Sequence, residues 1–374
     1  MTGKVLIAGG LGLVGRAAVE HFEALGDWDI VALSRREPDF PTQADFVSVD
    51  LSDREATLSA LSRIRDVTHI VYAAVMEKPV LADGWTDAEQ IAANLAMLRN
   101  LLDGLEPDNS TLRHITLLQG GKAYGAHLGP MNLPAKESDP RHMPPNFYFE
   151  QEDLLRRRQE QGAKWAWTVL RPMALIGFAL GSPMNLLSAI GTYAAIAREL
   201  DVPFRFTGAM HQQIGELTDT RLLARAIAWA GLSPAAANQI FNVTNGDFVV
   251  WQTLWPKLAN MLDVEWAPPQ PMPLSLMMAD KAPVWDEIVA RYGLVPHRYD
   301  AMANASWQFA DGMFGYNAPP NLALLSTVKI RRAGFHDCID SCEMFEDWIS
   351  ILRSRKILPS ISLSAHRRHG GVSG

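Results

Sequence analysis

Tyr148 is the side chain best suited to act as an acid in this sequence, because a phenol donates a proton more readily when a nearby cation lowers its pKa. In reductases built on a nucleotide-binding sheet, that cation is generally a lysine four residues further along the same helix. Here the fourth residue after Tyr148 is Glu152, whose carboxylate cannot replace the lysine. Either Tyr148 is idle or the cation comes from elsewhere, and Lys122, in the glycine-containing segment 119–125, is the candidate.

For both residues a plainer interpretation stays open. Tyr148 could be a buried aromatic at the start of a helix, and Lys122 could be a solvated loop cation. Three histidines, His127, His142 and His211, fall in predicted loops and could shape the mouth of a site, although a surface or hydrogen-bonded histidine is the more common case.

The N-terminal segment predicts a nucleotide-binding turn. An apolar run at residues 5–8 is short enough for a buried strand, and a helical pattern starts at Arg16, with Gly9, Gly12 and Gly15 between them. This spacing lets the turn tighten at the first glycine, a pyrophosphate approach the backbone at the second, and the helix pack on its strand at the third. The unpaired N–H groups at the helix start would then hold the phosphates. The alternative is an ordinary strand-to-helix turn.

The end of the second predicted strand, residues 29–33, indicates which dinucleotide would bind. It is followed by Ser34, Arg35 and Arg36, where a protein that selects the unphosphorylated cofactor usually has an acidic residue for the ribose hydroxyls. Two guanidinium groups instead match a 2′-phosphate and can stack on adenine. The sequence therefore favours NADPH over NADH, unless the arginines are a solvated pair.

Two further strand ends supply candidate contacts with the dinucleotide. Asp50 and Leu51 follow the third predicted strand and could meet the adenine edge, although Asp50 could equally be the N-cap of the next helix. Ala73 and Ala74 follow the fourth strand and offer a small-residue floor for a ribose, although small residues also serve ordinary packing.

Composition and charge exclude several other classes of protein. The chain has 374 residues, 48% of them hydrophobic, and a formal net charge of −7, without the dense Lys/Arg stripe that nucleic acids demand. We therefore expect a small-molecule partner and no nucleic acid.

The two cysteines, Cys338 and Cys342, are too few for a secreted disulfide framework. We expect them to be helical core side chains rather than metal ligands. The N-terminal pattern does not predict a signal peptide, so we expect a cytoplasmic protein.

Residues 172–197 carry no charged side chain and are long enough to span a bilayer. Pro183 and several glycines interrupt this stretch. We expect a strand ending near Leu175, a loop through residues 181–183, a buried helix at 184–199, and no membrane contact. A transmembrane span is the alternative.

Alternating strand and helix patterns in the first half predict an α/β fold: a Rossmann-type doubly wound parallel sheet with a smaller, mostly helical C-terminal substrate-binding region. We expect the sheet domain at residues 1–178, with residues of about 215–250 packing back on it, a substrate-binding and lid region at 179–358, and a weakly ordered tail at 359–374. Subunit number stays open, with a homodimer as one option.

The predicted strands are residues 5–8, 29–33, 44–49, 69–73, 113–118 and 165–170. Tryptophans expected to pack in the core and lid, rather than to stack on bases, are Trp251, Trp255, Trp266, Trp285 and Trp307.

Two motifs connect the chain with a known family. Residues 120–124 read Gly-Gly-Lys-Ala-Tyr and residues 146–153 read Asn-Phe-Tyr-Phe-Glu-Gln-Glu-Asp. The sequence thus resembles the progesterone 5β-reductase and iridoid synthase-like (PRISE) branch of the extended short-chain dehydrogenases/reductases, whose hallmarks are a lysine in a Gly-x-Lys-His-Tyr turn and a tyrosine in Asn-Phe-Tyr-Tyr-x-x-Glu-Asp. The resemblance covers nearly the whole chain up to about residue 359. Further matching segments are residues 171–178, 182–185, 193–196, 241–247, 307–311 and 334–335.

The resemblance implies an NADPH-dependent reductase of activated carbon–carbon double bonds in enones and enals. Hydride would go to the β-carbon, and Tyr148, with Lys122 close by, would stabilise the developing enolate oxygen. Matching positions imply cofactor contacts of Leu11, Gly12 and Leu13 with the pyrophosphate, Arg35 and Arg36 with the 2′-phosphate, Asp50 and Leu51 with the adenine, and Leu175, Ser182 and Met184 with the nicotinamide end. The expected cofactor-binding set also includes Gly9, Ser34, Ala73, Ala74, Gln119 and Tyr148.

Several departures from the family pattern lie near the expected substrate pocket. Ala123 replaces the histidine beside the lysine, Phe149 replaces the second tyrosine, and Pro183 replaces a loop methionine. Residues 206–211 lack the aromatic members of a tryptophan-rich stretch. Steroid or iridoid specificity is therefore not expected to carry over, whereas the core chemistry is.

Other functions remain as alternatives. A carbonyl reductase, acting on aldehydes or ketones, or a sugar-nucleotide epimerase of the wider superfamily would use the same type of cofactor, although the missing lysine after Tyr148 argues against the epimerase. A non-catalytic NADPH-binding sensor or scaffold would bind the cofactor without consuming it.

Overall fold

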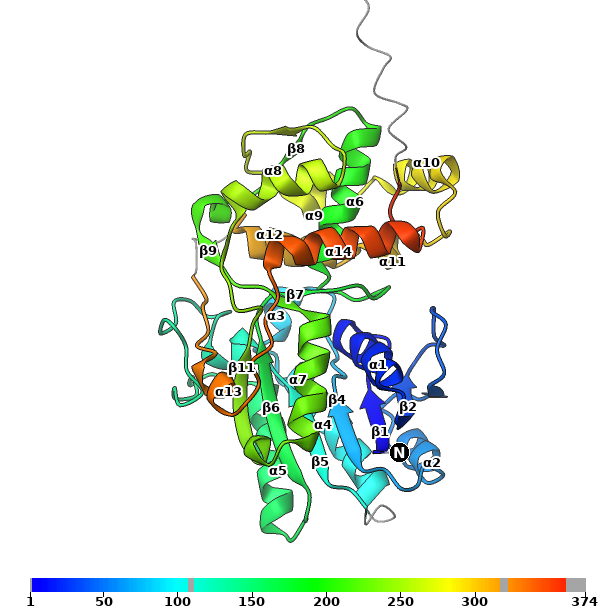
Figure 1. The fold of residues 1–374 in the computed structure, drawn as a ribbon, viewed down its shortest axis with the longest axis vertical. Coiled ribbons are helices and arrows are strands. Elements are labelled where there is room, and N and C mark those ends of the chain that lie inside the picture. Colours follow the sequence, from blue (N-terminus) through cyan, green and yellow to red (C-terminus); the bar gives the residue numbers. More distant parts are fainter. Residues whose placement is uncertain (1, 107–110, 317–321, 361–374) are drawn as a thin grey trace, which may run out of the picture.

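The computed structural model describes residues 2–106, 111–316 and 322–360, which form a seven-stranded parallel sheet with helices on both faces and a helical region at one end (Figure 1). This confirms the fold class that the sequence predicts. All six predicted strands are present, with bounds shifted by at most two residues. In spatial order the strands are β11 (Gln239–Val243), β6 (Ala166–Pro172), β5 (His114–Leu118), β4 (His69–Tyr72), β1 (Gly3–Ala8), β2 (Trp28–Ser34) and β3 (Asp45–Ser48).

Two hydrophobic clusters hold the helices on the two faces of the sheet. One contains side chains of α1 (Leu13–Leu25), α7 (Thr220–Leu232) and α13 (Val328–Arg332), and the other contains side chains of α2 (Arg54–Leu61), α4 (Ala88–Leu105) and α5 (Phe147–Glu160). The inner strand β1 is buried on both faces, as expected for a parallel sheet covered by crossover helices. The loops that follow the strands therefore carry the groups available to a ligand.

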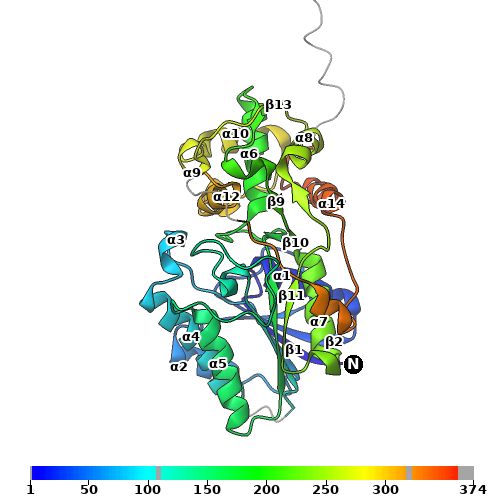
Figure 2. The ribbon, with the colours of Figure 1, turned by 90° about the vertical axis from the view of Figure 1, so that its left-hand side faces the viewer.

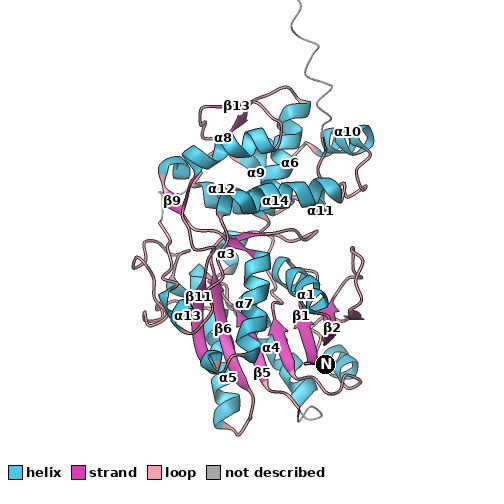
Figure 3. Cartoon of the chain, viewed as in Figure 1, coloured by secondary structure: helices cyan, strands magenta, loops and turns pink. Residues whose placement is uncertain are grey.

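The helical region has its own core and stacks on the end of the sheet (Figures 2 and 3). Its centre is α6, which is buried at almost every residue. The helices of this region are α6 (Leu186–Glu199), α8 (Trp251–Met261), α9 (Leu274–Met277), α10 (Ala282–Tyr292), α11 (Tyr299–Met302), α12 (Ser306–Phe314) and α14 (Ser341–Ser354). Short strand pairs complete the connections: β7 (Leu175–Ile176) with β10 (Thr218–Asp219), β8 (Phe204–Arg205) with β13 (Trp266–Ala267), and β9 (Ile214–Gly215) with β12 (Val249–Val250).

The uncharged stretch 172–197 enters this core. The predicted helix begins two residues later than expected, because the Asn185 side chain caps it by accepting a hydrogen bond from the Ser188 N–H at 3.1 Å. Within the described ranges, no helix is long and apolar enough to cross a membrane.

Some predictions differ from the structure in detail. Trp266 is 47% exposed on β13, whereas the other four predicted tryptophans are buried. Cys338 is exposed and precedes α14, so it is not a helical core side chain, and Cys342 in α14 is half-buried. Ile330 and Phe335, from the range assigned to the substrate-binding region, pack in the cluster of α1 and α7 instead. Of the predicted tail, residues 361–374 lie outside the described residues.

Replacement of Gly15 by alanine is predicted to destabilise the sheet domain. A Cβ atom at this position would lie 2.0 Å from the backbone carbonyl oxygen of Gly9, which cannot move without opening the turn. We expect a loss of about 2 kcal/mol in the free energy of unfolding, measured by urea denaturation. The control is Gly312→Ala in α12, where no atom lies within 4 Å, and which should be neutral or slightly stabilising. Equal stability of the two variants would contradict the close packing of the turn.

Candidate functional site

The turn after β1 has the shape required to hold a pyrophosphate. Gly9 has a φ of +83°, and a Cβ there would lie 2.9 Å from backbone atoms of Ala74 in the loop after β4. At Gly12, the N-cap of α1, the nearest atom to a Cβ would be the Gly9 carbonyl oxygen at 3.4 Å. The turn is therefore closed to side chains at Gly9 and Gly15 and open at the helix N-terminus, so these residues fit a dinucleotide.

The groups expected at the adenine end lie after β2 and β3. Arg35 is exposed, and its charge acts on Asp50, which accepts hydrogen bonds from the N–H and hydroxyl of Ser52. Those hydrogen bonds, more than Arg35, lower the pKa of Asp50. The alternative of Asp50 as an N-cap is wrong, because Asp53 caps α2 by accepting from the Ala56 N–H. Leu51 is buried, so its backbone rather than its side chain is available to a ligand.

Arg36 connects this end of the site with the helical region. Its Nη2 donates to the carbonyl oxygen of Leu180 at 2.9 Å, and its N–H donates to the Ser34 hydroxyl at 3.1 Å. Leu180 belongs to the loop that leads to Met184 and α6. The arginine predicted to contact the 2′-phosphate thus also holds the loop predicted to contact the nicotinamide.

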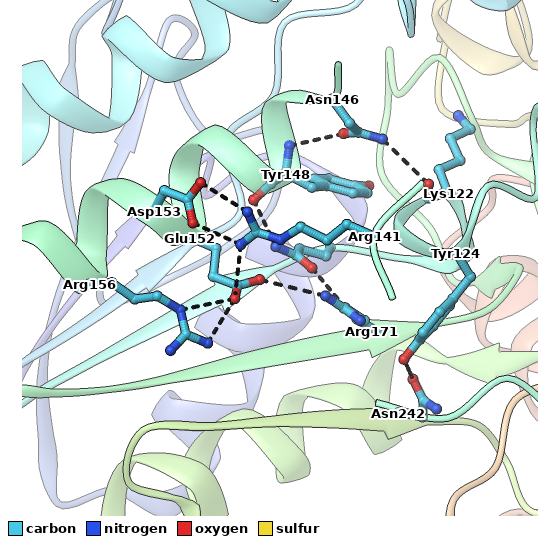
Figure 4. Close-up of polar contacts among 11 residues, drawn as sticks. Lys122, Tyr124, Arg141, Asn146, Tyr148, Glu152, Asp153, Arg156, Arg171 and Asn242 are labelled. Carbon is cyan, nitrogen blue, oxygen red and sulfur yellow. Dashed lines mark hydrogen bonds and ion pairs between the residues drawn. The ribbon is translucent and has the colours of Figure 1, made fainter. Parts of the chain in front are cut away.

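One asparagine ties the predicted catalytic lysine to the predicted catalytic tyrosine (Figure 4). Lys122 lies on a short 3-10 helix (Gly121–Tyr124) after β5, and Tyr148 lies in the first turn of α5. Asn146, the N-cap of α5, accepts from the Tyr148 N–H at 2.9 Å and donates to the Lys122 carbonyl oxygen at 3.4 Å. His142 contacts the same carbonyl at 3.2 Å. The backbones of the two segments are therefore fixed relative to each other.

Trp85 contacts both side chains. The Lys122 Nζ lies 3.6 Å from the centroid of the Trp85 ring, and the Trp85 and Tyr148 ring centroids are 5.2 Å apart. Met184, the predicted nicotinamide contact, has its Sδ 3.9 Å from the Lys122 Nζ. Lys122 is thus part of an aromatic cluster rather than a solvated loop cation, and cation–π attraction offsets part of its desolvation.

Burial changes the acid–base properties of both groups. It lowers the pKa of Lys122 to about 8, although the Glu77 carboxylate opposes this effect. It also raises the pKa of the Tyr148 phenol, as does the charge of Glu77, whereas Arg171 lowers it. The phenol consequently stays protonated at neutral pH and can donate a hydrogen bond. The Lys122 ammonium, whose pKa is lowered, loses its charge at a lower pH than an ordinary lysine does.

Glu152, which occupies the position where a lysine would be expected, serves a different purpose. Its buried carboxylate lies 3.1 Å from Arg141, 2.8 Å from Arg156 and 3.6 Å from Arg171. A lysine here would bring a fourth positive charge among three guanidinium groups. The cation that acts on Tyr148 must therefore come from another segment.

Gln119 takes part in the same network. Its Nε2 donates to the Tyr148 carbonyl oxygen at 2.9 Å, and its Oε1 accepts from the Arg171 Nε at 2.8 Å. Gln119 is among the residues predicted to bind the cofactor, and both polar atoms of its side chain have partners within the protein. The Tyr124 hydroxyl, from the lysine turn, donates to the Asn242 side chain at 2.6 Å.

The remaining residues named in the sequence analysis lie beside the glycine turn, in the loop that leads to α6, or against aromatic side chains. Leu11 and Leu13 are buried beside the glycine turn, Leu175 lies in β7, and the Ser182 carbonyl oxygen accepts from the Ser306 hydroxyl at 3.0 Å. His127 packs against Trp85, and burial together with the Lys122 charge lowers its pKa to about 4. It is therefore neutral at physiological pH. His211 lies on a short 3-10 helix beside Phe206.

The sequence analysis missed Glu77 and Trp85. Glu77 follows β4, and the rule that ligands bind beyond the carboxyl ends of parallel strands could have indicated it. Trp85 lies eight residues further along, after α3 (Leu81–Gly84), and no sequence signal places it beside Lys122. No group of three His, Cys, Asp or Glu residues suited to a metal ion occurs in the part of the chain that the structure describes.

Comparison with known proteins gives matches along most of the chain. Residues 43–314 match the PRISE-like Rossmann-fold domain family. The (S)-8-oxocitronellyl enol synthase CYC2 of Camptotheca acuminata is 34% identical over 375 residues, covering 95% of this chain and 93% of that protein. The (S)-8-oxocitronellyl enol synthase ISY2 of Nepeta racemosa is 33% identical, covering 95% of this chain and 91% of that protein.

Solved structures with the same fold are more distant in sequence. A short-chain dehydrogenase/reductase superfamily protein from Agrobacterium tumefaciens with bound NAD has a TM-score of 0.63 at 18% identity, covering 94% of this chain and 98% of that one. The UDP-glucose 4-epimerase of Thermus thermophilus in complex with NAD has a TM-score of 0.61 at 17% identity, covering 94% and 99%. At such low identity the similarity concerns the fold alone.

Replacement of Glu152 by glutamine is predicted to destabilise the protein, because Arg171 would keep its buried charge and lose its carboxylate partner. We expect a loss of about 3 kcal/mol in the free energy of unfolding. The control is Arg156→Gln, because Arg156 is 47% exposed and its contribution to the network should be below about 1 kcal/mol. Urea denaturation of both variants measures the difference, and a Glu152→Gln variant as stable as the control would contradict a structural role for this carboxylate.

Proposed function

Because this chain belongs to the PRISE-like Rossmann-fold family, we propose that it is an NADPH-dependent reductase of activated carbon–carbon double bonds in enones and enals. Family membership makes it a nicotinamide-dependent enzyme of the short-chain dehydrogenase/reductase type. The double bond as the reacting group, and NADPH as the preferred cofactor, are the parts that we propose. The observation that carries the proposal is the contact of Trp85 with both Lys122 and Tyr148.

The cofactor site would be formed by the strand ends described above. The N-terminus of α1, opened by Gly12, would hold the pyrophosphate through backbone N–H groups. Arg35, which is exposed beside Asp50, would meet a 2′-phosphate. When bound, NADPH supplies the hydride that reduces the substrate.

Tyr148 and Lys122 would stabilise the charge that appears on the substrate oxygen. Hydride addition to the β-carbon of an enone or enal moves an electron pair to the carbonyl oxygen and produces an enolate. The protonated phenol of Tyr148 would donate a hydrogen bond to that oxygen, and the Lys122 ammonium would add a positive charge in a site of low dielectric constant. Such donors accelerate the reaction because they bind the transition state more strongly than the ground state.

The names of the relatives agree with this chemistry. An enol synthase is by name an enzyme whose product is an enol. Protonation of the enolate on oxygen gives an enol, and Tyr148 would donate the hydrogen bond that stabilises that oxygen. The substitutions Ala123 and Phe149 beside the proposed catalytic pair lead us to expect a substrate different from that of the named relatives.

The test of the proposed function is an assay of NADPH oxidation with a panel of small cyclic enones, enals and the corresponding saturated ketones and aldehydes, followed by identification of the product by NMR. We expect consumption of NADPH with the enones and enals, and products in which the double bond is reduced and the carbonyl group retained. Products that retain the double bond and carry an alcohol would identify a carbonyl reductase instead. Tight NADPH binding without consumption would identify a non-catalytic protein.

The variant Tyr148→Phe is predicted to lose turnover about 100- to 1000-fold, because it removes one donor to the developing oxyanion. NADPH affinity should change little, since the ring and its contact with Trp85 are retained. Steady-state kinetics and fluorescence titration of NADPH measure the two effects. The control is Tyr292→Phe on α10 in the helical region, which should match the wild type. Near-normal alkene reduction by Tyr148→Phe would remove Tyr148 from the mechanism.

The variant Arg35→Ala is predicted to weaken NADPH binding about tenfold and to leave NADH binding unchanged, because only NADPH carries the 2′-phosphate. Arg35 is preferred to Arg36 for this test, because Arg36 also holds the Leu180 carbonyl. Dissociation constants for both cofactors measure the selectivity, with the exposed Arg157→Ala on α5 as the control. Equal losses for both cofactors, or no loss, would contradict the assignment.

A further inference from the structure

The loop after β4 is held in place by two buried side chains of α4. Asn94 accepts from the Met76 N–H and donates to the Met76 carbonyl oxygen, both at 2.9 Å. Gln90 accepts from the Lys78 N–H, also at 2.9 Å. Both residues are fully buried. The backbone on each side of Glu77 is therefore clamped, which fixes the direction of its side chain.

One of the two oxygens of the Glu77 carboxylate has a hydrogen-bond partner among the described residues, and the other has none. Its Oε2 accepts from the Gln90 Nε2 at 3.1 Å, so the same amide that holds the loop also orients the carboxylate. Its Oε1 is buried and makes no hydrogen bond within the described residues. A buried carboxylate oxygen without a partner is costly unless a positive charge lies nearby.

The positive charge is the ammonium group of Lys122, whose Nζ lies 3.6 Å from the ring centroid of Trp85, a residue of the same connection between β4 and α4 as Glu77. The two groups act on each other electrostatically: Lys122 lowers the pKa of Glu77 against the raising effect of burial, and Glu77 raises the pKa of Lys122 against the lowering effect of burial. The other contacts of the ammonium, the Trp85 ring and the Met184 sulfur, carry no formal charge. Burial alone would favour a neutral amine at this position.

Other titratable groups that face Lys122 cannot supply the negative charge. His127 packs against Trp85 and is neutral near pH 7. His142 contacts the Lys122 carbonyl oxygen through its ring. Tyr148, on α5, keeps its proton. Lys78, beside Glu77, is paired with Asp87 and Glu89.

We propose that Glu77 is a positioning residue that provides the counter-charge of the buried Lys122 ammonium and keeps it at the Trp85 ring, within the proposed oxyanion site. This inference rests on the proposed function, because it assigns Glu77 a part in the enolate-stabilising site. In this role Glu77 acts through Lys122, and Gln90 and Asn94 in turn fix Glu77 and its loop.

The test compares Glu77→Gln with the wild type by a direct titration of Lys122. Lysine labelled with a stable carbon isotope at Cε reports the charge state by NMR, and the Lys122 signal is assigned by its absence in Lys122→Met. The substitution keeps an acceptor for Gln90 and removes only the charge. We expect the Lys122 midpoint, close to pH 8 in the wild type, to fall by about one pH unit. An unchanged midpoint would overturn the inference.

The kinetic arm measures the pH dependence of kcat with a reactive enone. In the wild type the activity should fall as the pH rises through the Lys122 pKa, because the ammonium loses its charge. In Glu77→Gln this fall should move to lower pH by the same amount, a loss of about fivefold at pH 8 with little change at pH 6. A midpoint that moves in the NMR titration without any shift of the pH profile would also overturn the inference, because the charge would then not matter for turnover.

Two further variants complete the design. Glu77→Asp keeps the charge and should restore most of the wild-type midpoint and profile. Glu89→Gln, a substitution of an 81% exposed carboxylate on α4, should leave both unchanged. Failure of the proposed function is a separate result: a wild-type enzyme that does not reduce enones refutes the proposed function, whereas the NMR titration still decides whether Glu77 controls the charge of Lys122.

Discussion

The contact of the Lys122 turn with the first turn of α5 is the interaction on which the candidate site depends. Asn146 makes this contact through hydrogen bonds to both backbones, and Trp85 packs against both side chains. Without it, the Lys122 ammonium would not be held at the ring that packs against Tyr148, and Arg171 would remain as a cation that acts on the phenol. Because the lysine and the tyrosine come from different segments, their approach depends on the hydrogen bonds between the segment after β5 and the start of α5 rather than on the geometry of one helix turn.

Separating the cation from the tyrosine helix leaves the next turn of that helix free for another purpose. Glu152 uses it to join Arg141, Arg156 and Arg171, and Arg171 in turn orients Gln119, which holds the Tyr148 carbonyl. A lysine in that position could not serve this network. The arginine network therefore holds, through Gln119, the backbone of Tyr148 that the lysine turn contacts through Asn146.

The helical region is coupled to the sheet domain at the same place. Arg36, after β2, holds the Leu180 carbonyl, and Met184, a few residues on, contacts the Lys122 ammonium. A ligand that engages Arg36 would thus affect the contact that holds the loop beside Lys122. The clamped loop after β4 contributes Glu77, so that groups from the segments after β4 and after β7 both act on Lys122.

The sequence by itself determined the strands and the glycine turn, and it predicted the tyrosine and a displaced cation. These features arise from neighbouring residues: apolar periodicity, the spacing of Gly9, Gly12 and Gly15, and the replacement of a lysine by Glu152. Only the tertiary structure decided that Asp53 rather than Asp50 caps α2, that Gln119 is engaged within the protein, and that Trp85 and Glu77 surround Lys122. These relations join segments from different strand ends, and they depend on the order of the strands in the sheet and on the packing of α4 and α5, which no local pattern encodes.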